Sequence, residues 1–365
     1  MSIETTVTRA WQRRAIWLWL LLPISWLYGL VIMLRRQAYK LGLLSSYRAP
    51  VPVMVIGNIS VGGSGKTPLI ITLVNYLQGK GIKVGVISRG YGGDTSQMPA
   101  LVDTTSLPHV VGDEPCLIVH STGVTMAVCP SRQQAIRTVL DANPDIKLII
   151  ADDGLQHYAL QRDIEWIVVD AARGFGNKQL LPTGFLREPM SRLKGATVIS
   201  HEKPDTNAIN GHKQETSKHL TMYLQADGLQ RLWSLSSTES QLDSVAMPVN
   251  GSQVHAVSGI GYPQRFFDTL EALGFDVMGH PYPDHYEFKL DELLQYQDHP
   301  IVMTSKDAVK IRALLSAQMA TPVSNDTYGA LVSRLWILPV TAVLSDDCYD
   351  TLEQQMQTLG IDARY

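Results

Sequence analysis

The first quarter of the sequence contains almost no acidic side chains. Residues 1–93 carry 11 lysines and arginines but a single acid, Glu4, a balance of +10, whereas the rest of the chain carries 20 against 33, a balance of −13. A basic end on an otherwise acidic chain is typical of a protein that faces an anionic surface. The basic excess shows no pattern of interleaved aromatic side chains on a sheet, so we expect no nucleic-acid partner.

Cysteine is scarce as well. The three cysteines, Cys116, Cys129 and Cys348, have no spacing typical of a metal site, and we expect them to be packing residues in a reducing compartment. The sequence contains no internal repeat and no low-complexity tract. A chain of 365 residues is long enough for two domains of ordinary size.

Charge is absent from residues 15–34, which Arg13-Arg14 precede and Arg35-Arg36 follow. A helix of this length measures about 30 Å, the thickness of the hydrocarbon core of a bilayer. Four of the seven tryptophans lie in or beside the run, and tryptophan and arginine at the ends suit the membrane interface. We therefore predict a membrane-associating helix. Whether it spans the bilayer or lies in one leaflet stays open, because basic residues flank both ends.

Residues 51–67, VPVMVIGNISVGGSGKT, have the pattern of a phosphate-binding P-loop. An apolar strand, a glycine-rich turn and a helix expected over 67–77 follow one another, so that backbone N–H groups and the helix N-terminus can bind phosphate. Lys66 would reach the β- and γ-phosphates, and the Thr67 hydroxyl would bind Mg²⁺. One position departs from the generic motif, which has glycine where this chain has Ser60. The expected nucleotide-binding residues are Ser60, Val61, Gly62, Gly63, Ser64, Gly65, Lys66 and Thr67.

Two other interpretations of the apolar run are weaker. A buried core helix would account for Pro23, Ser25 and Gly29, which lower the hydropathy. A cleaved signal peptide would need an A-x-A cleavage site, which the sequence lacks. A nucleotide-binding loop follows soon after, so we expect the downstream chain in the cytosol, and the basic excess favours the anionic cytoplasmic leaflet.

Residues 147–153, KLIIADD, form a second nucleotide-related element. An apolar strand that ends in acid downstream of a P-loop is typical of a Walker B element, whose carboxylate holds Mg²⁺ directly or through water. The adjacent carboxylates of Asp152 and Asp153 would be costly to bury without a cation or a polar ligand. The sequence leaves open which of the two contacts the metal.

Strands alternate with helices along most of the chain, which predicts an α/β protein with parallel sheets covered on both faces. We expect a membrane-associating helix with basic flanks over 1–48, a P-loop domain with three α/β/α layers over 49–205, an inter-domain region over 206–253 and a smaller α/β domain over 254–365. The strands of the first domain are expected near 51–56, 83–88, 124–128, 147–153, 164–169 and 196–200. In the second domain we expect strands near 254–258, 301–304 and 335–340 and helices near 263–273, 307–315 and 346–359.

With these residues assembled, the chain resembles the tetraacyldisaccharide 4′-kinases, which phosphorylate the 4′-hydroxyl of the lipid A disaccharide precursor. The resemblance extends along nearly the whole chain, in the family's order, through RAPVPVMVIGNISVGGSGKTP, VISRGYGG, GDEP, ADDGLQH, LPTGFLRE, AVSGIGYPQRFF, PDHYEF and MTSKDAVKI. It implies ATP and Mg²⁺ as cofactors and two α/β/α domains with the active site between them. It also implies work at the cytoplasmic face of the bacterial inner membrane on a lipid substrate. We predict no protein partner.

The resemblance implies roles for individual residues. Asp113 of GDEP would take the proton from the sugar hydroxyl, and His285 of PDHY would orient and tune it, with Lys66 as the third catalytic residue. From the residues alone, Asp113 could equally be a helix N-cap. The residues implied to organise Mg²⁺ are Thr67, Asp152, Asp153 and Glu188. Those implied to contact the glucosamine and phosphate groups of the lipid are Arg132, Gln156, His157 and Arg187.

The two halves of the catalytic pair lie in different predicted domains. We therefore predict that Asp113 and His285 meet only when the domains close on the substrate, which would also exclude water. A disaccharide with several acyl chains stays in the bilayer. Helix 15–34 would bring the active site to it.

Two alternatives stay open from the sequence. A P-loop kinase of a soluble small molecule would explain Lys66 and Asp152-Asp153 but would leave the apolar N-terminus without a role. A membrane-tethered GTPase switch would need a guanine-reading N-K-x-D element. The nearest candidate, Thr304-Ser305-Lys306-Asp307, lacks the asparagine.

Overall fold

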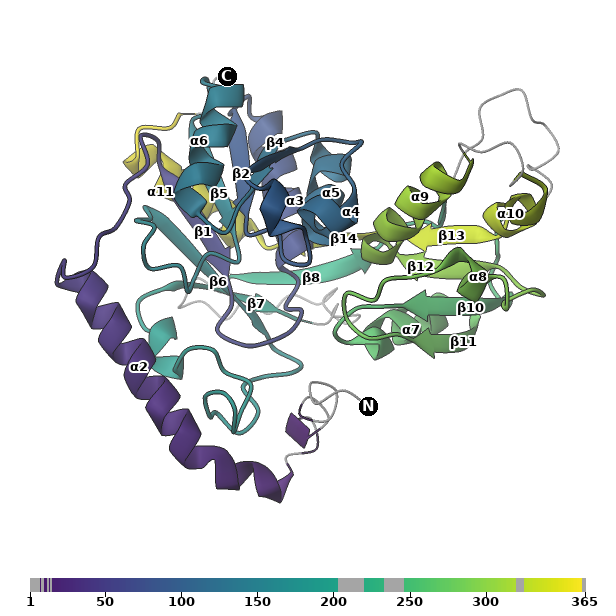
Figure 1. Ribbon diagram of the computed structural model, residues 1–365, viewed down its shortest axis with the longest axis horizontal. Helices are drawn as coiled ribbons and strands as arrows, with labels where there is room; N and C mark the ends of the chain where they lie inside the picture. The colour runs from purple at the N-terminus through teal and green to yellow at the C-terminus, as the bar shows by residue number, and fades with distance from the viewer. Residues whose placement is uncertain are drawn as a thin grey trace.

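The structure is a computed structural model that describes residues 7, 10, 11, 13, 15–202, 220–232, 246–319 and 325–362. Its two β-sheets form two domains that lie side by side, with the helix α2 (Leu22–Lys40) along the outside of the larger one (Figure 1). This arrangement confirms the predicted α/β fold with two sheets and an N-terminal apolar helix.

The larger domain is built on a nine-stranded sheet in the order β14-β8-β7-β6-β1-β5-β2-β4-β3. The two edge strands, β3 and β14, pair antiparallel with their neighbours, and the other pairs are parallel. β1, which precedes the P-loop, lies in the middle between β5 and β6. The strands are β1 (Val53–Gly57), β2 (Val84–Ser88), β3 (Ala100–Val102), β4 (Thr125–Val128), β5 (Leu148–Asp152), β6 (Ile164–Asp170), β7 (Thr197–His201), β8 (Thr221–Ala226) and β14 (Val340–Leu344).

Helices cover both faces of this sheet. Alternate side chains of β1 enter two apolar cores, Met54 and Ile56 into the one shared with α3, α5 and α11, and Val53 and Val55 into the one shared with α6. Such a strand is buried on both faces, which is why its sequence is continuously apolar. The helices are α3 (Lys66–Gly79), α4 (Pro108–Val111), α5 (Asp113–Thr122), α6 (Arg132–Ala142) and α11 (Asp346–Thr358).

The smaller domain repeats the layered plan on a five-stranded sheet in the order β11-β10-β12-β13-β9. α7 packs on one face with Phe266 and Leu270, and α9 packs on the other with Ile311 and Leu315. The strands are β9 (Gln230–Arg231), β10 (Gln253–Ser258), β11 (Asp276–Pro281), β12 (Ile301–Thr304) and β13 (Leu335–Leu338). The helices are α7 (Pro263–Ala272), α8 (Leu290–Leu293), α9 (Ser305–Met319) and α10 (Asn325–Val332).

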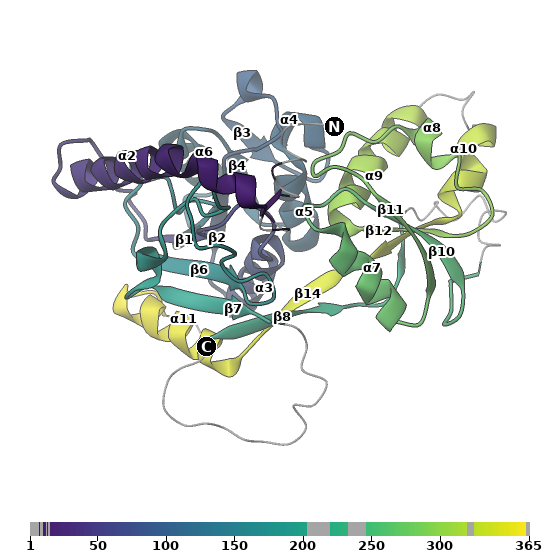
Figure 2. The ribbon, with the colours of Figure 1, turned by 90° about the horizontal axis from the view of Figure 1, so that it is seen from below.

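The chain passes between the domains at two neighbouring strand pairs. The strand expected near 335–340 is divided, because β13 belongs to the smaller sheet and β14 to the larger one. Pro339, which has no N–H to donate to a ladder, stands between them, and its carbonyl accepts from Asp227 N–H. β14 and α11, which we expected in the smaller domain, therefore complete the larger one (Figure 2).

The region expected to link the domains over 206–253 contains two strands. β8 joins the larger sheet, where it pairs with β7 and β14, and β9 joins the smaller one. The rest of that prediction falls largely on 203–219 and 233–245, which lie outside the described residues. Sequence that looks irregular and polar thus includes an ordered strand in each domain.

The N-terminal apolar run forms η1 (Ile16–Leu21) and α2, together 25 residues, and its most apolar window has a mean hydropathy of 2.0. Among the described residues, this is the one helix long and apolar enough to cross a membrane. Only 11% of its most apolar window is buried, which excludes a buried core helix. The helix is held by polar contacts: the Ser25 hydroxyl lies 2.8 Å from the Thr183 hydroxyl and accepts from the Thr183 N–H at 3.0 Å.

Candidate active site

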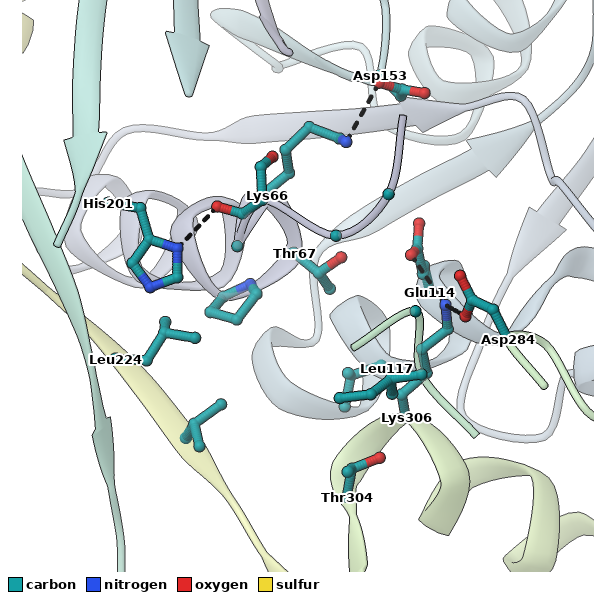
Figure 3. A pocket seen from close by; sticks show the side chains of 18 of the residues that line it. Lys66, Thr67, Glu114, Leu117, Asp153, His201, Leu224, Asp284, Thr304 and Lys306 are labelled. Atoms are coloured by element: carbon teal, nitrogen blue, oxygen red, sulfur yellow. Dashed lines mark hydrogen bonds and ion pairs between the residues drawn. The ribbon is translucent and has the colours of Figure 1, made fainter. Parts of the chain in front are cut away.

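A cavity of about 1540 Å³ lies between the two domains, at the carboxyl ends of β2 and β5. This edge of a parallel sheet is where ligands bind in open α/β folds. The larger domain contributes the P-loop and the start of α5, and the smaller domain contributes α7 and the start of α9. Figure 3 shows Lys66 and Thr67 on one side of this cavity and Thr304 and Lys306 on the other.

The P-loop has a backbone that only its glycines permit. Gly62 and Gly65 have φ angles of +96° and +91°, which are readily adopted by glycine alone. A Cβ on Gly65 would also lie 3.0 Å from the ring of His201. α3 begins at Lys66, so the unpaired N–H groups of its first turn lie at the cavity. Residues 61–67 line the cavity, whereas Ser60 forms a β-bridge with Leu186 and does not.

Two cations converge on the carboxylate of Asp153. Lys66 Nζ lies 3.3 Å from Oδ1, and the Arg187 guanidinium donates to Oδ2 at 2.8 Å. Although burial raises the pKa of Asp153, the charges of Lys66 and Arg187 lower it to about 2. Asp153 also has a φ angle of +46°, a conformation that strains a non-glycine residue. The structure therefore holds an ionised carboxylate beside the P-loop lysine.

Asp152 is in the opposite electrostatic state. Its side chain is only 1% exposed, and its Oδ2 accepts from the Ser88 hydroxyl at 3.2 Å. Burial and the carboxylates of Glu114 and Asp153 raise the pKa of Asp152 to about 7. Its Oδ1 has no hydrogen-bond partner among the residues that the structure describes. A buried oxygen of this kind is stabilised by a cation or a proton.

Asp113 and His285 meet across the domain boundary. His285 Nδ1 lies 3.0 Å from Asp113 Oδ2, and Asp113 Oδ1 accepts from the Glu114 N–H at 2.9 Å. His285 lines the cavity, and the buried Asp113 lies behind it. The N-cap of α5 is Gly112, so the interpretation of Asp113 as an N-cap is wrong. The pair that we expected on closure is formed in this arrangement of the domains.

The surroundings of the pair favour an ionised aspartate. Burial raises the pKa of Asp113, but the hydrogen bond with His285 and the charges of Lys306 and Lys310 outweigh it and leave the pKa below its ordinary value. Burial lowers the pKa of His285, and the hydrogen bond with Asp113 raises it, so that the net pKa lies above the ordinary value. His285 also has a positive φ angle of +57°. Strained residues of this kind are typical of functional sites.

Glu188 does not join the other metal candidates in the cavity. Its side chain is completely buried, Oε1 accepts from the Gln156 side chain at 3.2 Å, and Oε2 lies 3.3 Å from Arg192 Nε. Gln156 itself lines the cavity and donates to the Asn58 carbonyl at 3.0 Å. Glu188 is thus positioned to hold Gln156 and Arg192, and the structure does not bring it to Thr67.

The remaining substrate candidates line one wall of the cavity, namely Arg132, His157 and Arg187. The buried Arg132 guanidinium donates to the carbonyls of Cys129 and Asp152, at 3.2 Å each. Burial and the charges of Arg132 and Arg162 lower the pKa of His157 to about 4, so its ring is neutral near pH 7. This wall therefore combines fixed positive charge with a neutral imidazole.

The N-terminal helix also reaches the cavity. Tyr28 and Arg35 of α2 line it, and the Tyr28 hydroxyl donates to the Arg187 carbonyl at 3.2 Å. Arg35 lies 6.0 Å from the centre of the Tyr158 ring. In the sequence, Arg35 only marks the end of an apolar run, and no local pattern relates it to the active site.

Sequence reasoning also missed three charged side chains at the domain boundary. Lys306 pairs with Glu114 at 3.2 Å and with Asp284 at 3.4 Å, and all three line the cavity (Figure 3). They belong to the stretches MTSKDAVKI, GDEP and PDHYEF, which carried the resemblance without a role for these residues.

Comparison with known proteins gives a consistent result. A family model described as tetraacyldisaccharide-1-P 4′-kinase (LpxK) matches residues 17–357. A tetraacyldisaccharide 4′-kinase of Psychrobacter cryohalolentis is 71% identical, covering 99% of this chain and 98% of that protein. Another, of Ectopseudomonas mendocina, is 40% identical and covers 98% of this chain and 99% of that protein.

A solved structure has the same fold. The crystal structure of an "apo" form of LpxK from Aquifex aeolicus in complex with ATP superposes with a TM-score of 0.68 at 24% sequence identity. The match covers 94% of this chain and 99% of that one. The fold is therefore shared along nearly the whole length.

Proposed function

The chain belongs to the tetraacyldisaccharide 4′-kinase family, and we propose that it transfers the γ-phosphate of ATP to the 4′-hydroxyl of a tetraacylated glucosamine disaccharide 1-phosphate. The family's members are enzymes of lipid A synthesis. The observation that carries the proposal is a cavity in which a P-loop faces His285, with Asp113 paired behind it. Phosphoryl transfer depends on such positioning and on charge neutralisation.

ATP is the proposed phosphoryl donor. The N–H groups at the start of α3 and the left-handed glycines Gly62 and Gly65 suit a polyphosphate, and Lys66 lies beside them. In this arrangement Lys66 is paired with Asp153, and we expect it to turn from this carboxylate to the β- and γ-phosphates when nucleotide binds. The ATP-bound Aquifex aeolicus protein supports the choice of nucleotide.

Mg²⁺ fits the oxygen atoms around Asp152. Carboxylate and hydroxyl oxygens are the ligands it prefers, and the unpartnered Oδ1 of Asp152 needs a positive neighbour. Thr67, Asp152 and Asp153 would hold the ion, which would neutralise charge on the phosphates. Glu188 would act one step away, through Gln156.

Asp113 is the proposed base for the sugar hydroxyl. A hydroxyl is a poor nucleophile near neutral pH, and a carboxylate that takes its proton during attack accelerates transfer. The charges around Asp113 keep it ionised, and His285 would orient it and share the proton. Because the two residues interact strongly, they titrate as a pair.

The lipid would enter from the side of α2. Arg35, Arg132 and Arg187 give this wall a positive charge that suits a substrate already carrying a phosphate. The exposed apolar surface of α2 would hold the enzyme at the membrane, at the cytoplasmic face of the inner membrane where ATP is present. Tyr28 and Arg35 would then link membrane attachment directly to the active site.

The proposal is tested by following label from γ-labelled ATP into the acylated glucosamine disaccharide 1-phosphate in detergent micelles. We expect label in the lipid with the wild type and a loss of at least about a hundredfold with Lys66→Ala and with Asp113→Ala. Asp113→Ala should retain ATP binding. Asp103→Ala, which changes an exposed aspartate of the same domain, is the matched control and should keep full activity.

The opposite result would redirect the assignment. ATP hydrolysis without label in the lipid would contradict a lipid kinase and favour a soluble acceptor. GTP used in place of ATP would favour a nucleotide switch. The structure argues against a nucleotide switch, because Asp307 of the Thr304–Asp307 stretch is completely buried and accepts hydrogen bonds from the Thr304 hydroxyl and the Gly259 N–H.

A further inference from the structure

The first turn of α9 holds a lysine in a fixed position at the cavity. Asp307 Oδ2 accepts from the Thr304 hydroxyl at 2.7 Å and from the Gly259 N–H at 3.0 Å, and Asp307 Oδ1 lies 3.1 Å from Lys310 Nζ. These contacts tie the end of β12 to the loop after β10. Lys306 lies in this turn, between Thr304 and Asp307. Its side chain extends from the turn towards the larger domain.

The Lys306 ammonium lies among the groups of the catalytic pair. Its Nζ is 3.2 Å from Glu114 Oε1, 3.4 Å from Asp284 Oδ1, 3.3 Å from His285 Nε2 and 3.9 Å from Asp113 Oδ2. Glu114 comes from the larger domain and Asp284 from the smaller one. Lys306 therefore contacts both domains at the place where His285 meets Asp113.

The contact with His285 defines the state of the imidazole. An ammonium group can only donate hydrogen bonds, so the 3.3 Å contact with Lys306 Nζ favours the form of His285 in which Nε2 accepts. Nε2 accepts only in the neutral ring whose proton is on Nδ1, and that proton then points at Asp113 Oδ2, 3.0 Å away. In this state Asp113 is a carboxylate anion that accepts a hydrogen bond from His285. Its other lone pairs can still accept the proton of the sugar hydroxyl.

Building on the proposed function, we propose that Lys306 is a positioning residue for phosphoryl transfer, which holds His285 in its neutral Nδ1–H form and thereby keeps Asp113 ready to accept a proton. Lys306 would act through the pair and not on the phosphate. Glu114 of the larger domain and Asp284 of the smaller one both pair with the Lys306 ammonium. The protonation state of Asp113 and His285 would therefore depend on the two domains being in contact.

The charged and titratable groups facing the pair come from four elements. The larger domain contributes Glu114 of α5 and Tyr91, whose ring lies 5.0 Å from that of His285, and Cys116 lies one turn along α5. The smaller domain contributes Asp284, Lys306 and Lys310, with Lys310 Nζ 3.8 Å from Asp113 Oδ2 and paired with Asp307. Lys306 alone among them contacts both Asp113 and His285.

These charges determine the direction in which the pH dependence of activity should shift when Lys306 is removed. The charge of Lys306 lowers the pKa of Asp113 and of His285. Removing it favours the protonated pair, so activity should be lost at a higher pH as the solution is acidified. An opposite charge at this distance shifts a pKa by about one unit or more.

The test is the pH profile of kcat/KM for Lys306→Gln, with label transfer to the lipid as the assay. We expect the acidic limb to move up by about one pH unit, with the KM for ATP changed less than about threefold, and Lys306→Arg to return the limb towards the wild type. Arg265→Gln is the matched control. It removes another ion pair between the domains, with Asp170 at 2.8 Å, and should leave the position of the limb unchanged. An unmoved limb in Lys306→Gln, or an equal shift in Arg265→Gln, would overturn the proposal.

A second readout does not depend on lipid phosphorylation. The ¹⁵N shifts of His285 in the wild type, assigned by loss of its signals in His285→Gln, should show the neutral Nδ1–H form at pH 8. The Nε2–H form at that pH would overturn the role of Lys306. A wild type that transfers no phosphate would instead contradict the proposed function, and the ¹⁵N shifts would still decide the state of the pair.

Discussion

At the scale of single residues, the site obtains different chemistry from identical side chains by placing them differently. Asp152 and Asp153 are adjacent, yet the pKa of Asp152 is raised to about 7 by burial and neighbouring carboxylates, and that of Asp153 is lowered to about 2 by Lys66 and Arg187. The chain turns through a left-handed residue at Asp153, which separates the two environments. Neither state follows from the letters DD.

His157 gives a prediction about the pH dependence of stability. Its folded pKa is about 4, below the ordinary value near 6.5, so the folded protein resists taking up a proton that the unfolded chain binds. Its contribution is therefore present above about pH 6.5 and is lost as the pH falls from there towards 4. Between pH 7.5 and 5, the urea midpoint of the wild type should fall further than that of His157→Gln.

The exposed His109 provides the control for this measurement. His109→Gln should follow the wild type at both pH values. His157→Gln could instead lose as much stability as the wild type between pH 7.5 and 5. The ring of His157 would then have to be protonated in the folded protein, which would contradict a neutral imidazole beside Arg132.

The sequence predicted some of these residues and missed others for a physical reason. Lys66, Thr67 and Asp152-Asp153 lie at the ends of strands with local signatures, so their meeting at one sheet edge follows from the parallel fold. The Asp113–His285 contact spans two domains, and only the family resemblance suggested it. Lys306 and Arg35 act through contacts with segments far away in the sequence, which no local pattern records.

At the scale of elements, the strands buried on both faces were predicted closely. β1, β5 and β12 are short apolar runs bounded by turns, and each lies within two residues of its expected range. The strand β8, next to the edge of the larger sheet, and the edge strand β9 of the smaller one were not found, because both are partly exposed and carry polar residues. The division between β13 and β14 depends on a pairing partner, which the sequence does not reveal.

The docking of α2 on the loop around Thr183 gives a second prediction. Ser25→Ala removes the acceptor of the buried Thr183 N–H, and an unsatisfied buried group costs about 1–3 kcal/mol. We expect faster amide hydrogen exchange over 180–187 and a lower rate of lipid phosphorylation. Ile24→Ala, at a 54% exposed position on the same helix, should leave the exchange of this loop unchanged. Slow exchange in Ser25→Ala would mean that α2 is held by other contacts.

At the scale of the whole molecule, apolar exposure and positive charge are gathered at one end. Leu20, Ile24, Leu27 and Val31 share one side of the N-terminal helix, and each is more than half exposed. Their spacing of three or four residues makes a continuous apolar stripe. The basic excess of residues 1–93 accompanies this stripe, so binding to an anionic membrane would combine both effects.

Replacing Leu27 and Val31 by glutamate should weaken sedimentation with anionic vesicles by at least about tenfold, because two buried aliphatic side chains stabilise membrane binding by several kcal/mol. Transfer to lipid dispersed in detergent should fall much less. Leu101→Glu with Leu107→Glu, two exposed apolar positions elsewhere on the larger domain, is the control and should sediment like the wild type. Equal sedimentation of all three proteins would contradict membrane attachment through this stripe.

The return of the chain through β14 has a consequence for biosynthesis. Cys348, Leu352 and Met356 of α11 belong to the core that also contains α3, the helix of the P-loop. The nucleotide-binding domain therefore cannot complete its packing until α11 has left the ribosome, after the smaller domain has been made. A nascent chain stalled inside the final helix would expose an unfinished core and the edge of β8, both of which favour aggregation. The core behind the P-loop is thus completed only after the smaller domain has been synthesised, although the P-loop precedes that domain in the chain.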